Sequence, residues 1–178
     1  MVIMKILKLA DNPQYFDEFT KSLFIEWKDV FIAMKYTTLL DVKKMYIKLF
    51  NNGTVAYICI KDDGELIGFY TLLKHKRTVH LCDLFIKPQY RGRGLGQKLV
   101  RHAIYHIHEF DSLCNHIYIS AYINTVTFYL KLGFTIVKKS DNNTYTMIYT
   151  INHNKNNYVY YIFCIIAAII LLWWMMIL

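Results

Sequence analysis

The chain has 178 residues, which is enough for one domain with a substantial hydrophobic core. Its formal net charge of +8 would suit nucleic-acid binding, but the sequence has no recognised nucleic-acid motif and no long basic run, so we expect none. Its four cysteines show no CxxC spacing, which is typical of reduced thiols in a cytosolic domain.

The first half of the chain predicts a strand, two amphipathic helices and a hairpin. Asn12 and Pro13 are typical of a helix start, and Thr38 with Asp41 is a weak variant of a capping box at the start of the second helix. The turn Asp62-Asp63-Gly64 indicates a hairpin. The expected strands are residues 2–9, 55–61 and 65–74, and the expected helices are residues 13–27 and 39–50.

The second half predicts a strand, a glycine-rich loop, a long helix, another strand, a short helix capped by Asn124, and a closing hairpin. The expected order of the whole domain is β-α-α-β-β-β-α-β-α-β-β. The expected strands are residues 78–86, 116–122, 134–140 and 144–151, and the expected helices are residues 95–110 and 125–132.

The last segment, Tyr158 to Leu178, contains no charged and no small polar side chain. As a helix it would be about 30 Å long, the thickness of the hydrocarbon core of a bilayer. Tyrosines lie near one end and Trp173-Trp174 near the other, as interfacial belts do. A buried core helix is the alternative, but a run that is apolar on every side is too long for so small a domain.

We therefore expect residues 158–178 to be a transmembrane anchor, preceded by a polar linker at residues 152–157. The first ten residues are interrupted by Lys5 and Lys8 and do not resemble a secretory signal, which argues against a glycolipid anchor. The remaining reading is a tail anchor that leaves the domain in the cytosol, in agreement with the basic residues on the domain side. A helix that binds another protein in a soluble complex is the alternative.

The run Arg91-Gly92-Arg93-Gly94-Leu95-Gly96 follows an apolar strand and opens a helix. Glycines leave main-chain N–H groups free to close on a bulky group, the helix dipole aims at the same place, and two arginines add positive charge. This arrangement favours a pyrophosphate site. Neither a P-loop nor the Gly-x-Gly-x-x-Gly dinucleotide fingerprint is present, and a basic surface turn is the plainer alternative.

The surrounding run, residues 81–99, resembles the acetyl-CoA motif of the GNAT N-acetyltransferase superfamily, Arg/Gln-x-x-Gly-x-Gly/Ala, filled here by Arg91, Gly94 and Gly96. The segment Phe128-Tyr129-Leu130-Lys131-Leu132-Gly133-Phe134 resembles the Phe-Tyr-x-x-x-Gly-Phe ending of that family. The resemblance covers residues 1–151. It implies the GNAT acyl-CoA N-acyltransferase fold, an α/β (α+β) domain in which a mixed, mostly antiparallel sheet flanked by helices opens into a wedge for the cofactor.

The resemblance also implies acetyl-CoA as co-substrate and assigns residues to it. The main chain of the loop would hold the diphosphate, and the strand before the loop would pair with the pantetheine arm, with the Ile86 N–H polarising the thioester carbonyl. Asn124 would touch the cofactor at the edge of the site. The residues assigned to the cofactor in this way are Leu84, Phe85, Ile86, Arg91, Gly92, Arg93, Gly94, Leu95, Gly96, Gln97 and Asn124.

Tyr129 matches the general-acid tyrosine of the family. Because a phenol has a pKa of about 10 and a thiol of about 8.5, a hydrogen bond to the developing thiolate is a more economical role than full proton transfer. The base is less clear, because some members read Leu-Glu-Asp where this chain reads Leu81-Cys82-Asp83. Asp83, if a bulge re-aims it, is preferred to His80 acting through water, and Cys82 as an acetyl-carrying nucleophile is a third alternative.

The expected function is acetyl transfer by direct attack of a primary amine, carried by a protein or a small molecule, at a membrane surface. A poor base favours a peptide α-amine over a lysine. The alternative is an anchored CoA-binding module without turnover. His102 and His106 have metal-like spacing but no third ligand, so we expect two solvent-side histidines and no metal.

Overall fold

The computed structural model describes residues 4–75, 78–110, 114–141 and 143–151. Within these ranges no helix is long and apolar enough to cross a membrane. The predicted linker at residues 152–157 and the predicted transmembrane helix at residues 158–178 lie outside the described residues. The membrane anchor therefore stays a prediction.

The described residues form one seven-stranded sheet in the order β1-β2-β3-β4-β5-β7-β6. Every neighbouring pair is antiparallel except β4 and β5, which are parallel. The mixed, mostly antiparallel sheet expected from the sequence is confirmed. The strands are β1 Met4–Lys8, β2 Val55–Lys61, β3 Leu66–His75, β4 Thr78–Ile86, β5 His116–Tyr122, β6 Thr135–Lys139 and β7 Thr144–Thr150.

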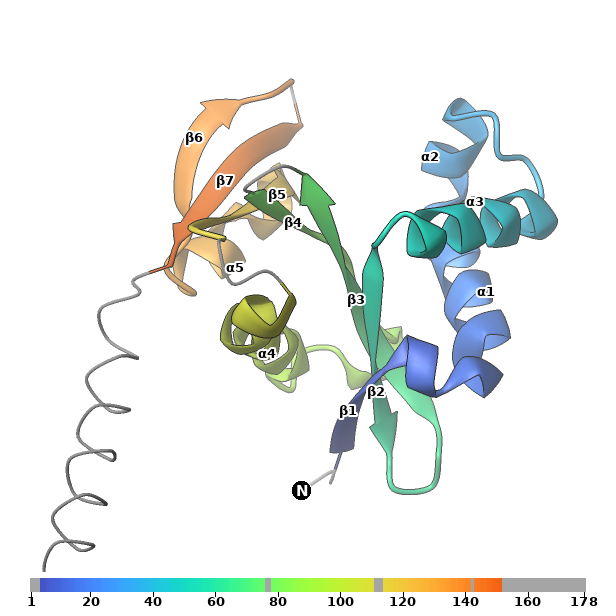
Figure 1. Ribbon diagram of the computed structural model, residues 1–178. Helices are drawn as coiled ribbons and strands as arrows, with labels where there is room; N and C mark the ends of the chain where they lie inside the picture. Colours follow the sequence, from blue (N-terminus) through green and yellow to red (C-terminus); the bar gives the residue numbers. More distant parts are fainter. Residues whose placement is uncertain (1–3, 76–77, 111–113, 142, 152–178) are drawn as a thin grey trace, which may run out of the picture.

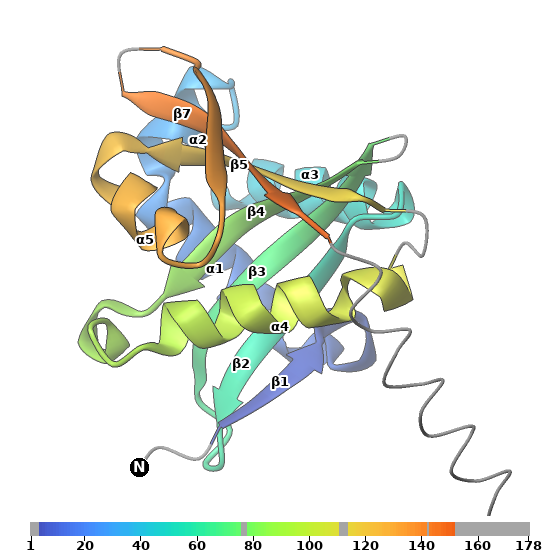
Figure 2. The same ribbon diagram turned by 90° about the vertical axis from the view of Figure 1, so that its left-hand side faces the viewer.

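Helices cover both faces of the sheet (Figures 1 and 2). The first three pack against one face around Phe19, Leu23 and Phe69, and α4 lies along the other face around Leu99 and Ile107. The apolar stripes of these helices thus form two cores separated by the sheet. The helices are α1 Phe16–Glu26, α2 Lys28–Ala33, α3 Leu39–Asn51, α4 Leu95–Phe110 and α5 Val126–Leu130.

The first predicted helix, residues 13–27, is wrong in its extent. A short 3-10 helix, Pro13–Tyr15, precedes α1, and Asn12 makes no side-chain cap bond. The chain then leaves α-helical geometry at Trp27 (φ −119°) and begins the separate helix α2. The predicted capping box is confirmed, because Asp41 N donates to Thr38 Oγ1 and Asp41 Oδ2 accepts from Thr38 N.

The sheet opens between β4 and β5. These strands pair only over Thr78–His80 and His116–Tyr118, and beyond that point β5 continues with β7 alone. The expected wedge is therefore present, at the end of β4 that leads to the glycine-rich loop.

A bulge interrupts β4 inside this wedge. Phe85 pairs with Phe69 and Cys82 with Thr71, so that Asp83 and Leu84 together oppose one residue of β3. Asp83 has φ 51°, a left-handed conformation that aspartate tolerates better than most side chains. Asp83 was preferred as a base on the condition that a bulge changes the direction of its side chain, and this bulge is present.

Candidate active site

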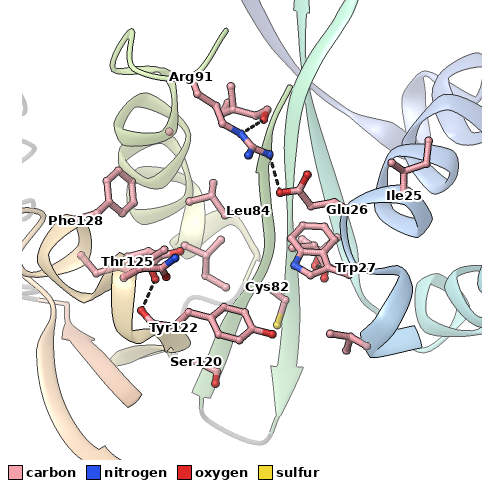
Figure 3. Close-up of a pocket in the computed structure, with 18 of the residues that line it drawn as sticks. Ile25, Glu26, Trp27, Cys82, Leu84, Arg91, Ser120, Tyr122, Thr125 and Phe128 are labelled. Carbon is pink, nitrogen blue, oxygen red and sulfur yellow. Dashed lines mark hydrogen bonds and ion pairs between the residues drawn. The ribbon is translucent and has the colours of Figure 1, made fainter. Parts of the chain in front are cut away.

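A large cleft follows the open wedge, with a volume of about 1410 Å³. Helices α1–α3 and β3 line one part of it, which we call the acceptor half, and the loop 90–97, β5 and α5 line the other, the cofactor half; β4 lies between them (Figure 3). Pockets for drug-sized ligands hold about 300–1,000 Å³. The cleft therefore has room for a large cofactor and an acceptor together.

The glycine-rich loop lines the cofactor half and leads directly into α4. Gly92 and Gly94 both have φ 76°, and no heavy atom lies within 4 Å of a Cβ built on either of them. The positive φ therefore favours glycine at these two positions, although the surrounding space would admit a side chain. Such a loop, followed by the positive end of a 16-residue helix, fits a diphosphate.

The β4 edge beside the loop is open for a further extended chain. The N–H of Lys87 donates to the Ile67 carbonyl on β3 (2.9 Å), so alternation along the strand directs the Ile86 N–H to the other edge, which β5 has left. This geometry suits the oxyanion role assigned to Ile86. Phe85 stacks on Phe69 (4.8 Å), which leaves only its main chain for a cofactor.

Arg91 reaches across the cleft instead of folding over its own loop. Its Nε donates to the Ile86 carbonyl (2.8 Å) and its Nη2 lies 2.6 Å from Glu26 Oε1 at the end of α1 (Figure 3). Arg93 lies over the ring of Tyr90 (5.7 Å). The side chain of Arg91 therefore joins the loop to the acceptor half.

The segment before the loop is held by Glu65, at the start of β3. The Tyr90 hydroxyl donates to Glu65 Oε2 (2.5 Å), and the Lys87 ammonium lies 3.3 Å from Glu65 Oε1 and 2.9 Å from Glu18 Oε1. The Tyr90 hydrogen bond is the main cause that holds the pKa of Glu65 below its usual range. These contacts fix both ends of the turn that precedes Arg91.

The bulge turns Asp83 toward α3. Its Oδ2 accepts hydrogen bonds from the Tyr46 hydroxyl (2.8 Å) and from Thr71 Oγ1 (2.6 Å). Burial raises the pKa of Asp83, while the hydrogen bonds from Thr71 and Tyr46 act in the opposite direction. A carboxylate with a raised pKa holds a proton more strongly, and Asp83 lines the cleft.

Cys82 and Tyr129 both line the cleft. Burial, with a smaller contribution from Asp83, raises the pKa of the Cys82 thiol to about 12. The thiol is therefore neutral at physiological pH, which argues against an acetyl-carrying nucleophile. Burial also raises the pKa of Tyr129 to about 12, so its phenol keeps its proton and can donate it in a hydrogen bond.

His80 lies outside the cleft lining, at the end where β4 and β5 pair. Its ring stacks on Tyr118 (5.6 Å), and burial and the nearby His75 lower its pKa. The role of His80 as a base stays a prediction that this position does not favour.

Two further expectations need correction. Asn124 lines the cleft, but the N-cap residue of α5 is Thr125, whose hydroxyl donates to the Tyr122 carbonyl (2.8 Å), so Asn124 is not the cap.

His102 is not on the solvent side, because its Nδ1 lies 2.7 Å from the Tyr70 hydroxyl on β3. Among the described residues no cluster of ligands could hold a metal ion.

The residues that sequence reasoning missed are those on the acceptor half. Tyr46 lies on the apolar face of α3, and its hydroxyl partner is 37 residues away in the chain. Glu26, Trp27 and Glu65 likewise gain their roles only through distant partners. The periodicity of α3 could place Tyr46 toward the sheet, but no local signal pairs it with Asp83.

A sequence model of the acetyltransferase (GNAT) domain matches residues 30–147. The chain belongs to the GNAT family. The family uses acetyl-CoA, and the prediction made from the two motifs is confirmed at the level of family and cofactor.

Curated relatives match the chain over parts of their length. An uncharacterized N-acetyltransferase of Archaeoglobus fulgidus is 29% identical over 76 residues, which is 39% of this chain and 52% of the relative. A putative [ribosomal protein bS18]-alanine N-acetyltransferase of Bacillus subtilis is 31% identical over 72 residues, 40% of this chain and 48% of the relative. The chain thus spans about half the length of these relatives.

Solved structures show the same fold. A putative acetyltransferase from Acinetobacter baylyi superimposes with a TM-score of 0.67 at 16% identity, over 84% of this chain and 94% of that one. An aminoglycoside 6'-N-acetyltransferase complexed with coenzyme A gives a TM-score of 0.66 at 18% identity, over 84% and 97%. At this identity the likeness confirms the GNAT fold alone.

Proposed function

We propose that this GNAT protein transfers the acetyl group of acetyl-CoA to a primary amine by direct attack. The observation that carries the proposal is that the glycine-rich loop, the bulged edge of β4, Asp83 and Tyr129 all line one cleft. Loop amides between Arg91 and Gln97 bind the diphosphate, and the Ile86 N–H binds the thioester oxygen.

Asp83 on β4 then accepts the proton of the amine, and Tyr129 on α5 stabilises the departing thiolate. The amine nitrogen forms a bond to the acetyl carbon and loses a proton to Asp83, directly or through a water. The carbon–sulfur bond breaks, and Tyr129 donates a hydrogen bond to the departing thiolate, which takes up a proton on release. Cys82, in the place of the glutamate of some relatives, takes no part in these steps.

The acceptor amine is proposed to have a modest pKa. Deprotonating a lysine-type amine of pKa about 10.4 at pH 7 costs roughly 4–5 kcal/mol, whereas an α-amine of pKa about 7.8 costs about 1 kcal/mol. Burial raises the pKa of Asp83, but a carboxyl group starts from about 3.9, and the hydrogen bonds from Tyr46 and Thr71 stabilise its charged form, so it is poorly matched to the first task. An α-amine fits the site better.

Turnover by the full chain in detergent tests the proposal. We expect acetyl-CoA to be consumed with an amine panel, and Tyr129→Phe to lower kcat by about 10²-fold while acetyl-CoA still binds. If the wild-type chain binds acetyl-CoA but acetylates no amine, the protein is instead a CoA-binding module. The cysteine in place of glutamate is the observation that favours this second candidate.

We also propose that residues 158–178 anchor the protein in a membrane with the domain facing the cytosol. The support is the sequence: an uncharged apolar run of bilayer length with aromatic residues near both ends. We expect the full chain to stay with membranes in alkaline carbonate, and its domain to be digested by protease added on the cytosolic side. Release of the full chain by carbonate would contradict the anchor.

A further inference from the structure

Apolar side chains form the wall of the acceptor half. They come from α2 and its two flanking segments, from α3 and from β3, and they line the same cleft as Asp83. Figure 3 shows the Trp27 indole across the cleft from Leu84. The apolar side chains are Trp27, Phe31, Met34, Met45, Leu49 and Leu73.

From this wall we infer that the acceptor is a primary amine carried by an apolar group, such as a hydrophobic N-terminal residue or a small apolar amine. The inference rests on the proposed acetyl transfer and adds the substrate class. Burying the apolar group against the wall would supply binding energy and place the amine at Asp83, because apolar surface gains when it leaves water.

Charges in the acceptor half argue against a polycationic acceptor. Such an acceptor needs several free carboxylates, but Glu26 is paired with Arg91 at 2.6 Å and Asp83 already accepts two hydroxyl bonds. Of the other residues that line this half, Asp29 is acidic and Lys28 is basic, so they offset each other. The net charge of +8 on the chain adds repulsion.

The hydroxyl groups of this wall offer little to a polar acceptor. Those of Tyr46 and Thr71 donate to Asp83. The Thr54 hydroxyl is buried, so solvent and ligands do not reach it. Beyond Asp83, the described wall therefore presents mainly hydrocarbon and sulfur to an acceptor.

Helix α2 supplies a matched pair for the test. Val30 lines the cleft and Ile32 does not, although both are β-branched residues of similar exposure, 42% and 44%. Neither side chain belongs to the buried cores. A glutamate can therefore be placed at either position without opening the interior.

The first experiment compares acceptors for the full chain with acetyl-CoA. The panel is a peptide with N-terminal methionine, the same peptide with N-terminal aspartate, phenylalanine amide, spermidine, and a peptide with a blocked N-terminus and a free lysine. We expect kcat/KM for the methionine peptide or phenylalanine amide, both of which carry an α-amine on an apolar group, to exceed the others by at least about tenfold. Whichever of the two is faster identifies the source of the apolar amine.

The second experiment compares two variants. Val30→Glu should lower kcat/KM for the preferred apolar amine by about tenfold, with KM for acetyl-CoA unchanged, whereas Ile32→Glu should behave as the wild type. Equal rates for both variants, or a preference for spermidine or the aspartate peptide, would overturn the inference while leaving acetyl transfer intact. If no amine is acetylated although acetyl-CoA binds, the proposed function itself fails, and the inference with it.

Discussion

Asp83 has a left-handed backbone conformation, and its side chain accepts two short hydrogen bonds and has a raised pKa. The left-handed backbone and the burial of the carboxyl group are costs, which the two hydrogen bonds offset only in part. Such clustering of strained and perturbed features is typical of functional sites.

Replacement of Asp83 by asparagine should separate catalysis from stability. Asp83→Asn should lower kcat by about 10²-fold, because the amide cannot take the proton of the amine, with little change in acetyl-CoA binding. Steady-state rates and calorimetry on the same preparation check both statements. Activity near that of the wild type would remove Asp83 from the reaction.

The same substitution should raise the thermal stability at neutral pH. Because the folded-state pKa of Asp83 lies above the unfolded value of about 3.9, the folded state binds more protons between these two values. Stability due to this group is therefore lost as pH rises through that window. We expect Tm of Asp83→Asn to exceed that of the wild type at pH 7 and to approach it near pH 3; a lower Tm at pH 7 would contradict the sign.

Tyr46 on α3 should lower the pKa of Asp83. Tyr46→Phe removes one hydrogen bond that favours the charged form of Asp83, so the pKa of Asp83 should rise and the acid limb of kcat/KM should move to higher pH. The pH profile is the readout, since a purely structural role would lower activity at every pH without moving the limb.

At the scale of elements, the glycine-rich loop owes its position to neighbours outside it. Glu65, just before β3, binds Tyr90 and Lys87, and Glu18 on α1 also binds Lys87. The loop is thus fixed by the sheet and by α1 before any ligand arrives, which reduces the cost of ordering it on binding.

Loss of the Glu65 carboxylate should weaken cofactor binding. We expect Glu65→Gln to raise KM for acetyl-CoA several-fold with kcat little changed, because the turn before Arg91 is loosened. Asp63→Asn is the control, since Asp63 pairs with Lys61 in the same hairpin and makes no contact with Lys87 or Tyr90. Equal effects of the two variants would show that only hairpin stability matters.

A second pair of variants tests the loop conformation. Gly94 and Gly53 both have positive φ and open space where a Cβ would lie, but only Gly94 belongs to the loop. Alanine at either position should cost about 1 kcal/mol of folding free energy. Only Gly94→Ala should also weaken acetyl-CoA binding, measured by titration; similar affinities for both variants would argue against the loop amides.

At the scale of the whole molecule, the sequence predicted the cofactor half better than the acceptor half. The glycine-rich loop and the Phe-Tyr-x-x-x-Gly-Phe segment are local motifs, so their residues could be recognised without knowing the fold. The bulge at Asp83 depends on the register between β3 and β4, and the Tyr46 contact joins residues 37 positions apart. Neither leaves a local pattern.

The errors in predicted elements have similar causes. The predicted first helix ended at Trp27, close to the observed end of α1 at Glu26, but nothing in the spacing indicated that α2 would follow at Lys28. Asn124 has the right side chain for a cap, yet a 3-10 helix, Ile123–Thr125, moves the cap position to Thr125. Tertiary packing thus decided boundaries that propensity alone could not.

The proposed function depends on the main-chain amides between residues 91 and 97, which bind the diphosphate of a coenzyme A thioester. Titration calorimetry of the full chain in detergent with acetyl-CoA tests this most directly. We expect saturable one-to-one binding that Gly94→Ala weakens and Gly53→Ala does not. If a folded wild-type chain releases or absorbs no heat with either acetyl-CoA or coenzyme A, the loop amides do not bind the diphosphate.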